Sequence, residues 1–380
     1  MTATAIAPAL PAAPEAPTVV KTSNAVDSLL YRTLDMKGSD LHLVAGTTPW
    51  VSVHGETVRM DGLSRELDAE TLRRALRQMV TEEEWKQFWA EKRLDFSYQT
   101  ERSNFRGHFA VAGGEPMAVF RTIPSVVPDF DDLGLPEIIR SFIDDEGGLY
   151  LFIGVTGSGK SSSLAALIKL AKEKYAKKII TIEAPIEYRH THGKSLVVQR
   201  EVGKGRDVDS FAIGVEDALR ENPDIILVGE MRDPATMSAA LSATSSGHLV
   251  FSTLHAGSTA DAPARILEAM PADRVADTRA QLARSLKGVV YQKLLPKKGG
   301  GGRVVATEVL MMNQAISNMI KNNNTEGIAG QLLSKDSGSI PFEVSLVNLV
   351  LDGVINESTA LDAELRNGSY LRQKEAGRRN

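Results

Sequence analysis

The chain has 380 residues, of which 42% are hydrophobic and 24% are charged. This composition is typical of a globular protein and excludes a collagen-like or wholly disordered chain. The 44 basic and 48 acidic residues give a formal net charge of −4, which does not indicate a bulk attraction to nucleic acid. Cysteine is absent, so disulfides, thiol nucleophiles and Cys-ligated metal sites are excluded.

The length favours two or three domains, preceded by an N-terminus of distinct composition. Residues 1–23 are rich in alanine and proline, and the first cation is Lys21. A secretory signal would need a basic start and an uninterrupted apolar core, so we expect a flexible tail here. The chain has no run of about 20 apolar residues, and therefore no membrane span is expected.

We expect residues 24–126 to form a small α+β domain. Their apolar residues predict, in chain order, a helix over 25–35, short strands over 40–60, two helices over 65–92 and strands over 94–123. Prolines and acidic residues over 127–136 indicate a linker to the next domain.

Beyond residue 137, short apolar runs alternate with helical stretches. The runs are LYLFI (149–153), KIITI (178–182), DIILV (224–228) and HLVFST (248–253). Continuous apolar strands between helices predict a buried, mostly parallel sheet. We therefore expect an α/β domain over 137–366 with C-terminal helices, followed by a polar tail over 367–380.

Residues 154–161 read G-V-T-G-S-G-K-S and fit G-x-x-x-x-G-K-[ST] in full. An apolar run precedes this segment and an amphipathic helical pattern follows it, which is the setting that a phosphate loop requires. Its glycines let backbone N–H groups turn towards phosphate oxygens. Lys160 is predicted to reach the β- and γ-phosphates of ATP, and Ser161 to supply a hydroxyl to Mg²⁺. The predicted nucleotide-binding residues are Gly154, Thr156, Gly157, Ser158, Gly159, Lys160, Ser161 and Ser162.

Acidic residues follow two other predicted strands. Glu230 ends DIILVGE, where it could lie near Mg²⁺, directly or through a water, while also pairing with Arg232. Glu183 and Glu187 lie four residues apart around Pro185. One of them could act as a general base towards water, and solvated loop acids are an equally good interpretation.

Four histidines lie near these segments. His248 and His255 flank the strand LVFST, where a histidine could donate to a phosphate or to a catalytic carboxylate. A lone histidine is more often a structural hydrogen bonder. His190 and His192 have no further metal ligands at good spacing, so a solvated loop is favoured over a metal site.

Arg106 and Arg121 lie in predicted strands of the first domain. P-loop enzymes often take an arginine from elsewhere to neutralise transition-state charge. Spacing alone does not distinguish that role from a solvated surface arginine.

Several longer motifs support a resemblance to a known family. They are, in chain order, SDLHLVAGTTP, VFRTIPS, GVTGSGKSSSLAALI, IITIEAPIEY, VVQREVG, ALRENPDIILVGEMRD and GHLVFSTLHA. Together they cover roughly residues 24–350 and resemble the secretion ATPases of the type II/IV pilus superfamily, in particular the PilT/PilU retraction ATPases. The resemblance implies a PAS-like N-terminal domain followed by a RecA-like ATPase domain. It also implies a ring, typically a hexamer, that couples ATP hydrolysis to type IV pilus retraction and twitching motility.

The resemblance also implies roles for individual residues. Glu187 falls on the glutamate expected to activate water, and Glu230 is the Walker B glutamate beside Mg²⁺. His255 lies in the family's histidine box. The two arginines fall on N-terminal residues that approach the phosphates, at least some from the adjacent subunit. The implied catalytic set is Glu187, Glu230, His255, Arg106 and Arg121.

Three departures from the family pattern bear on this interpretation. Ala184 stands where the family usually has an aspartate in E-D-P-[IV]-E. Residues 315–321 read A-I-S-N-M-I-K and lack both arginines of A-I-R-x-L-I-R, a segment tied to retraction. EYRHTHGKSLVVQREVG and STLHAGS look more like PilU, the accessory retraction ATPase. An accessory role beside a second retraction ATPase therefore stays open.

The family also implies a location and partners. We expect a cytoplasmic ring that is recruited to the inner membrane by a pilus platform protein, and no nucleic-acid partner. One alternative is a pilus-assembly or type II secretion ATPase, which the short N-terminal domain and the absence of cysteine disfavour. A type IV secretion ATPase and a non-catalytic nucleotide-binding adaptor are further alternatives.

Overall fold

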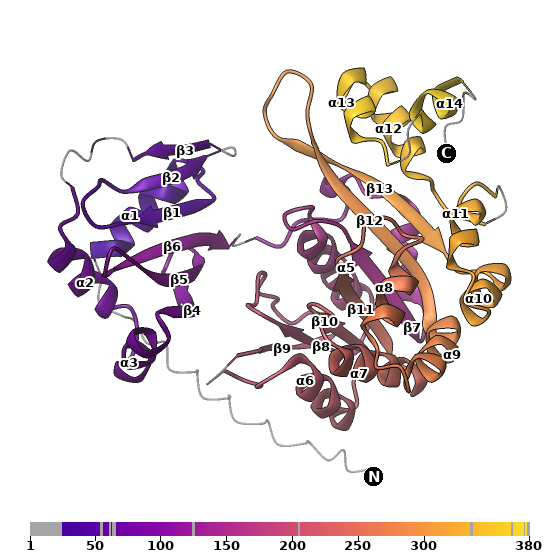
Figure 1. Cartoon of the computed structure of the whole chain (residues 1–380), viewed down its shortest axis with the longest axis horizontal. Helices are drawn as coiled ribbons and strands as arrows, with labels where there is room; N and C mark the ends of the chain where they lie inside the picture. Colours follow the sequence, from indigo (N-terminus) through magenta and orange to yellow (C-terminus); the bar gives the residue numbers. More distant parts are fainter. Residues whose placement is uncertain are drawn as a thin grey trace, which may run out of the picture. The chain divides into compact units, whose positions relative to one another are not determined.

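The computed structural model describes residues 25–53, 56–60, 62, 66–123, 126–203, 206–334, 337–365, 368–375 and 377. The tail expected over 1–23 lies outside the described residues, as do residues 367, 376 and 378–380 of the one expected over 367–380. The chain divides into two compact units, Met1–Thr122 and Ile123–Asn380. Figure 1 shows the elements of each unit. Among the described residues, no helix has both the length and the apolar character needed to cross a bilayer.

The described part of the N-terminal unit contains a six-stranded sheet in the order β3-β2-β1-β6-β5-β4 (Figure 1). The strands are β1 (Asp40–Leu43), β2 (Trp50–Val53), β3 (Glu56–Arg59), β4 (Arg93–Gln99), β5 (Asn104–Ala112) and β6 (Glu115–Ile123). The pairs β1–β2, β1–β6, β2–β3 and β4–β5 are antiparallel. The helices are α1 (Ala25–Asp35), α2 (Ala69–Arg77) and α3 (Glu82–Glu91).

One face of this sheet is apolar and the other is polar. Phe105 and Phe109 of β5 and Phe120 of β6 are fully buried in the core of this unit. Since successive side chains of a strand point to opposite faces, Arg106 and Arg121 lie on the open face. The alternation of side chains along β5 and β6 therefore places both arginines where solvent or a partner reaches them.

The second unit is built on a seven-stranded sheet in the order β13-β12-β7-β11-β10-β8-β9. The strands are β7 (Gly148–Ile153), β8 (Lys178–Glu183), β9 (Leu196–Glu201), β10 (Ile225–Val228), β11 (Leu249–Leu254), β12 (Leu286–Pro296) and β13 (Arg303–Met311). All neighbouring pairs are parallel except β12–β13. Every residue of β7 and β11 is buried, as the continuous apolar runs predict.

Helices cover both faces of the parallel sheet. The α-helices are α4 (Glu137–Arg140), α5 (Lys160–Lys174), α6 (Phe211–Ala218), α7 (Pro234–Ser245), α8 (Ala262–Ala269), α9 (Val275–Ser285), α10 (Gln314–Lys321), α11 (Ile328–Gln331), α12 (Phe342–Leu351), α13 (Glu357–Ala363) and α14 (Ser369–Glu375). Short 3₁₀ helices lie at Asp131–Leu133, Ser141–Asp144, Leu219–Glu221 and Thr325–Gly327. Leu164 of α5 packs with Phe152 in one core cluster, whereas Leu241 of α7 and Leu282 of α9 pack with Leu151 in another.

Candidate functional site

The phosphate loop joins the end of β7 to the start of α5, as the motif predicts. Gly154, Gly157 and Gly159 adopt φ values of 137°, 77° and 94°, a region that side chains with a Cβ rarely enter. At Gly154 an added Cβ would lie 2.5 Å from the carbonyl oxygen of Gln292. Glycine is therefore required at this position by both backbone conformation and space.

Lys160 is the first residue of α5 and lies over the loop. Its ammonium donates to the carbonyl oxygens of Gly154 and Val155, each at 2.9 Å. Burial lowers the pKa of Lys160, and the charges of Glu230 and Glu187 oppose that shift. Both carboxylates therefore act on the charge of this ammonium.

The loop and the first turn of α5 also carry hydroxyl groups. Ser158 is buried, and its Oγ has no hydrogen-bond partner among the described residues. Ser162 Oγ is hydrogen-bonded to Tyr188 Oη at 2.7 Å, and Gln292 donates to Ser163 Oγ at 2.7 Å. An unpaired hydroxyl, a lysine and the N-terminus of a 15-residue helix form a donor set that fits nucleotide phosphates.

The strand order explains why the acidic residues gather beside this loop. The strands β8, β10, β11 and β7 are consecutive parallel neighbours, so their carboxyl ends lie along one edge of the sheet. Glu183 is the last residue of β8, Glu230 follows β10 and His255 follows β11.

The carboxylate of Glu230 is in contact with two side chains. Arg232 Nε lies 2.6 Å from one carboxylate oxygen and His255 Nε2 lies 3.2 Å from the other. The Glu230 side chain is only 16% exposed, whereas that of Arg232 is 73% exposed. A cavity of about 450 Å³ opens beside these residues and is also lined by Arg265. The pairing of Glu230 with Arg232 is confirmed, and His255 is a second partner.

Glu183 and Glu187 have different surroundings. Glu183 Oε1 accepts hydrogen bonds from Thr181 Oγ1 at 2.7 Å and from Gln199 Nε2 at 3.2 Å. Burial raises the pKa of Glu183, although these hydrogen bonds act in the opposite direction. Glu187 is exposed and acts on the charge of Lys160. Of the two carboxylates, Glu187 is thus the one open to a ligand at the phosphate loop.

Gln199 and Tyr188 belong to this region, although no sequence motif points to a role for either of them. Tyr188 contacts the hydroxyl of Ser162, and Gln199 contacts Glu183. In the sequence, Gln199 is marked only as a polar amide within the strand segment VVQREV. The structure pairs it with Thr181 on the neighbouring strand β8.

His248 does not share the position of His255. It precedes β11, and its carbonyl oxygen accepts a hydrogen bond from Gly148 at the start of β7. His248 Nδ1 is 3.0 Å from both the Ala243 carbonyl oxygen and Ser246 Oγ. The idea that both histidines lie at the ligand edge is therefore wrong for His248, which is a structural hydrogen bonder at the opposite edge.

The other two histidines lie in the β8–β9 connection. His192 is exposed, and its Nδ1 accepts a hydrogen bond from the backbone of Val197. His190 is partly buried, and burial, with a smaller effect of Lys172, lowers its pKa from 6.5 to about 4. The expectation of a solvated loop thus fails for His190. In the described parts of the chain, no cluster of three or more His, Asp or Glu side chains could hold a metal ion.

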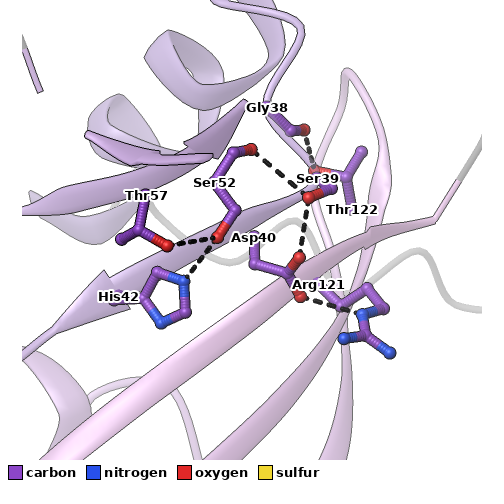
Figure 2. Close-up of polar contacts among 8 residues, drawn as sticks. All are labelled: Gly38, Ser39, Asp40, His42, Ser52, Thr57, Arg121 and Thr122. Atoms are coloured by element: carbon purple, nitrogen blue, oxygen red, sulfur yellow. Dashed lines mark hydrogen bonds and ion pairs between the residues drawn. The ribbon is translucent and has the colours of Figure 1, made fainter. Parts of the chain in front are cut away.

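Arg121 is held by a polar cluster on the open face of the N-terminal sheet (Figure 2). Its Nε donates to Asp40 Oδ1 at 2.8 Å, and Ser39 Oγ donates to the other oxygen of Asp40 at 2.7 Å. Figure 2 shows the two terminal nitrogens of Arg121 pointing away from Asp40. Arg106 lies on the same face of the sheet and contacts Asp95 at 3.7 Å. Both arginines belong to the N-terminal unit.

Comparisons with known proteins agree with this architecture. Residues 90–343 match the family described as Type II/IV secretion system protein. The chain is 37% identical over 337 residues to the type IV pilus retraction ATPase PilT of Pseudomonas aeruginosa, spanning 88% of this chain and 96% of that protein. It is 33% identical over 337 residues to the type IV pilus ATPase PilU of the same organism, spanning 88% and 87%.

A solved structure shows the same fold. The crystal structure of the pilus retraction motor PilT with bound ADP matches this chain with a TM-score of 0.83 at 34% identity, covering 92% of this chain and 100% of that one. The predicted fold class, an α+β domain followed by an α/β domain with a mostly parallel sheet, is confirmed. The chain therefore belongs to the type II/IV secretion system protein family, among its PilT/PilU-type ATPases.

Proposed function

We propose that this protein is a ring-forming ATPase motor that retracts a type IV pilus and so drives twitching motility. The observation that carries the proposal is a phosphate loop at the carboxyl ends of the parallel strands, in which the charges of Glu230 and Glu187 act on Lys160. Two catalytic carboxylates beside a phosphate loop serve nucleotide hydrolysis. The similarity to PilT over nearly the whole chain supports retraction as the work done.

The phosphate loop would bind the nucleotide through its own donors. Lys160 now donates to carbonyl oxygens of the loop, and phosphate oxygens would replace these neutral acceptors with charged ones. The buried hydroxyl of Ser158 supplies a further donor. Ser161 and Glu230 offer the oxygen ligands that Mg²⁺ prefers, Glu230 directly or through a water. When bound, Mg²⁺ neutralises charge on the β- and γ-phosphates.

Glu187 is proposed to accept a proton from the attacking water. Its exposed carboxylate can reach a ligand, whereas the carboxylate of Glu183 is already used by Thr181 and Gln199. His255 Nε2 lies 3.2 Å from Glu230 Oε1, and this contact would orient the carboxylate. Each positioned proton acceptor of this kind typically contributes on the order of 10²–10⁴ in rate.

The assembly is proposed from the family. Arg106 and Arg121 would neutralise phosphate charge, at least in part from the adjacent subunit of a hexameric ring. The ring would act in the cytoplasm, bound to a pilus platform protein of the inner membrane, alone or beside a second retraction ATPase. Ser317 of α10 stands where the family pattern has the first arginine of A-I-R-x-L-I-R. Its Oγ donates to the Ala283 carbonyl oxygen of α9 at 2.7 Å, which supports a structural role for this serine.

The direct test is ATP hydrolysis by the full chain with and without Mg²⁺, with the oligomer size recorded. Glu187→Gln should keep ADP binding and lose hydrolysis by at least about 100-fold, because it removes a proton acceptor. Lys160→Ala should lose both, because it removes a phosphate contact. Glu173→Gln makes the same chemical change at an exposed position and should leave hydrolysis unchanged. Full turnover by Glu187→Gln would exclude Glu187 as the base.

A further inference from the structure

The segment between β8 and β9 carries Glu187 without regular secondary structure. Gln199 lies on β9, the edge strand of the sheet, directly across from Thr181 on β8. From this position its side chain reaches back over the start of the segment. Its Nε2 donates to the carboxylate of Glu183 at 3.2 Å.

The amide of Gln199 also binds the backbone of the segment itself. The same Nε2 donates to the Tyr188 carbonyl oxygen at 2.8 Å, and its Oε1 accepts a hydrogen bond from the His190 backbone N–H at 2.8 Å. A segment outside the sheet lacks ladder partners for its peptide groups. Here the side chain of Gln199 supplies hydrogen-bond partners to the peptide groups of Tyr188, the residue after Glu187, and of His190.

Two further contacts hold Glu187 from its other sides. A backbone contact from Glu187 acts to lower the pKa of the Glu183 carboxyl, and Gln199 donates to that same carboxylate. The hydroxyl of Tyr188 is hydrogen-bonded to the hydroxyl of Ser162 on α5. Ser162 lies two residues after Lys160. The backbone next to the exposed side chain of Glu187 is therefore held by contacts with β8, β9 and the phosphate-loop helix α5.

We propose that Gln199 is a positioning residue that holds Glu187 in place for hydrolysis. This inference rests on the function proposed above, in which Glu187 accepts a proton from water. Proton transfer needs the acceptor within hydrogen-bond reach of the water, and a displacement of about 1 Å can lower a rate on the order of 100-fold. The contacts made by Gln199 go to Glu183, Tyr188 and His190 and not to the phosphate loop. Its loss should therefore reduce turnover and spare nucleotide binding.

Lys172 provides a matched control on the same connection. Its buried ammonium donates to the carbonyl oxygen and the hydroxyl of Thr191, at 2.8 and 3.1 Å. Lys172→Met therefore releases a tether four residues beyond Glu187 while leaving the contacts of Gln199 in place. A general effect of loosening the connection would appear in both variants, whereas a specific effect on Glu187 would appear only in the Gln199 variants.

The experiment compares Gln199→Leu and Lys172→Met in the full chain, measuring kcat and KM for ATP hydrolysis together with the affinity for ADP. Gln199→Leu should lower kcat by about 10–100-fold and leave KM and ADP affinity close to those of the wild type. Lys172→Met should keep its kcat. Gln199→Glu retains the acceptor for His190 but loses the donor to Tyr188, so it should also lose turnover and serves if the leucine variant does not fold.

Hydrogen exchange gives a readout that does not depend on activity. The amide of His190 should exchange faster in Gln199→Leu than in the wild type, and at the wild-type rate in Lys172→Met. An active wild type with an equally active Gln199→Leu would overturn the positioning role alone, as would equal losses of kcat and ADP affinity. An inactive wild-type ring would instead overturn the proposed function and the role that depends on it.

Discussion

Glu183 and Glu187 have the same side chain, but their surroundings suit them to different roles. Glu183 ends β8, where burial raises its pKa and two side-chain donors occupy one of its oxygens. Glu187 is exposed and lies close enough to Lys160 to act on its charge. Paired carboxylates whose environments differ in this way commonly divide acid–base work between them. Burial, and not residue type, thus selects Glu187 as the candidate base.

His190 should make stability depend on pH. Its pKa is about 4 in the folded chain and 6.5 when unperturbed, so the unfolded chain binds the proton first as pH falls. Its contribution to stability is therefore present above pH 6.5 and is lost as pH falls towards 4. Between pH 7 and pH 5 the free energy of unfolding should fall by about 1–2 kcal/mol on account of this residue.

Urea denaturation of the wild type, His190→Gln and His192→Gln at both pH values measures this effect. His190→Gln should show the smaller loss on acidification, and His192→Gln, at an exposed position, should follow the wild type. The same loss in all three proteins would assign the pH dependence to other groups.

Two helices near the site are each preceded by an aspartate, but only one of these aspartates caps its helix through its side chain. Asp233 precedes α7, and its carboxylate accepts from the backbone N–H of Thr236 at 2.9 Å and from its hydroxyl at 2.7 Å. Asp261 precedes α8 and makes no capping hydrogen bond. Since the chain runs from Glu230 into α7 within four residues, the cap of α7 also fixes where the Walker B segment ends.

The two aspartates form a matched pair for measuring that cap. Asp233→Ala should lower the free energy of unfolding by about 0.5–2 kcal/mol, because two hydrogen bonds at the start of α7 are lost. Among the described residues, Asp261→Ala loses a contact with the Ser258 hydroxyl and no capping bond, so it should cost less. Chemical denaturation of both variants gives the comparison, and an equal loss of stability would show that the cap of α7 contributes nothing beyond the charge.

The candidate residues are divided between the two units of the whole molecule. Lys160, Glu187 and Glu230 belong to the unit with the parallel sheet, and Arg121 belongs to the N-terminal unit. Asp40 binds Nε of Arg121, and the terminal nitrogens point away from it (Figure 2). A guanidinium oriented in this way keeps its two terminal nitrogens available for a bidentate contact with phosphate. A ring would let this arginine serve the site of a neighbouring copy.

Mixed rings test whether Arg121 acts between subunits. Arg121→Ala and Lys160→Ala should each be nearly inactive, because an arginine at the transition state is worth on the order of 10³–10⁵ in rate. When the two variants are dissociated and reassembled together, some sites combine an intact Lys160 with an intact neighbouring Arg121, and ATPase activity should return in part. Lys160→Ala mixed with Glu187→Gln should stay inactive, because no site then has both residues. Absence of recovery in the first mixture would mean that Arg121 acts within its own subunit.

Much of the fold and the phosphate loop could be predicted because their signals are local. Glycine spacing indicates the backbone conformations that residues 154–161 adopt, and apolar runs indicate buried strands wherever they lie in the sheet. The apolar spacing after Lys160 likewise predicts α5, and the strand character of residues 94–123 predicts that Arg106 and Arg121 lie in strands. Such patterns depend on neighbours along the chain, so no knowledge of tertiary contacts is needed.

Only the tertiary structure separated His255 from His248, and Glu187 from Glu183. The two histidines flank one strand, but the carboxyl ends of β8, β10, β11 and β7 meet at a single edge, and only His255 lies there. Gln199 could not be assigned because its partners are nine to sixteen residues distant in sequence and come together only through the register of β8 with β9. Composition and motif determine which chemical groups this chain carries, whereas burial and strand order decide which of those groups meet.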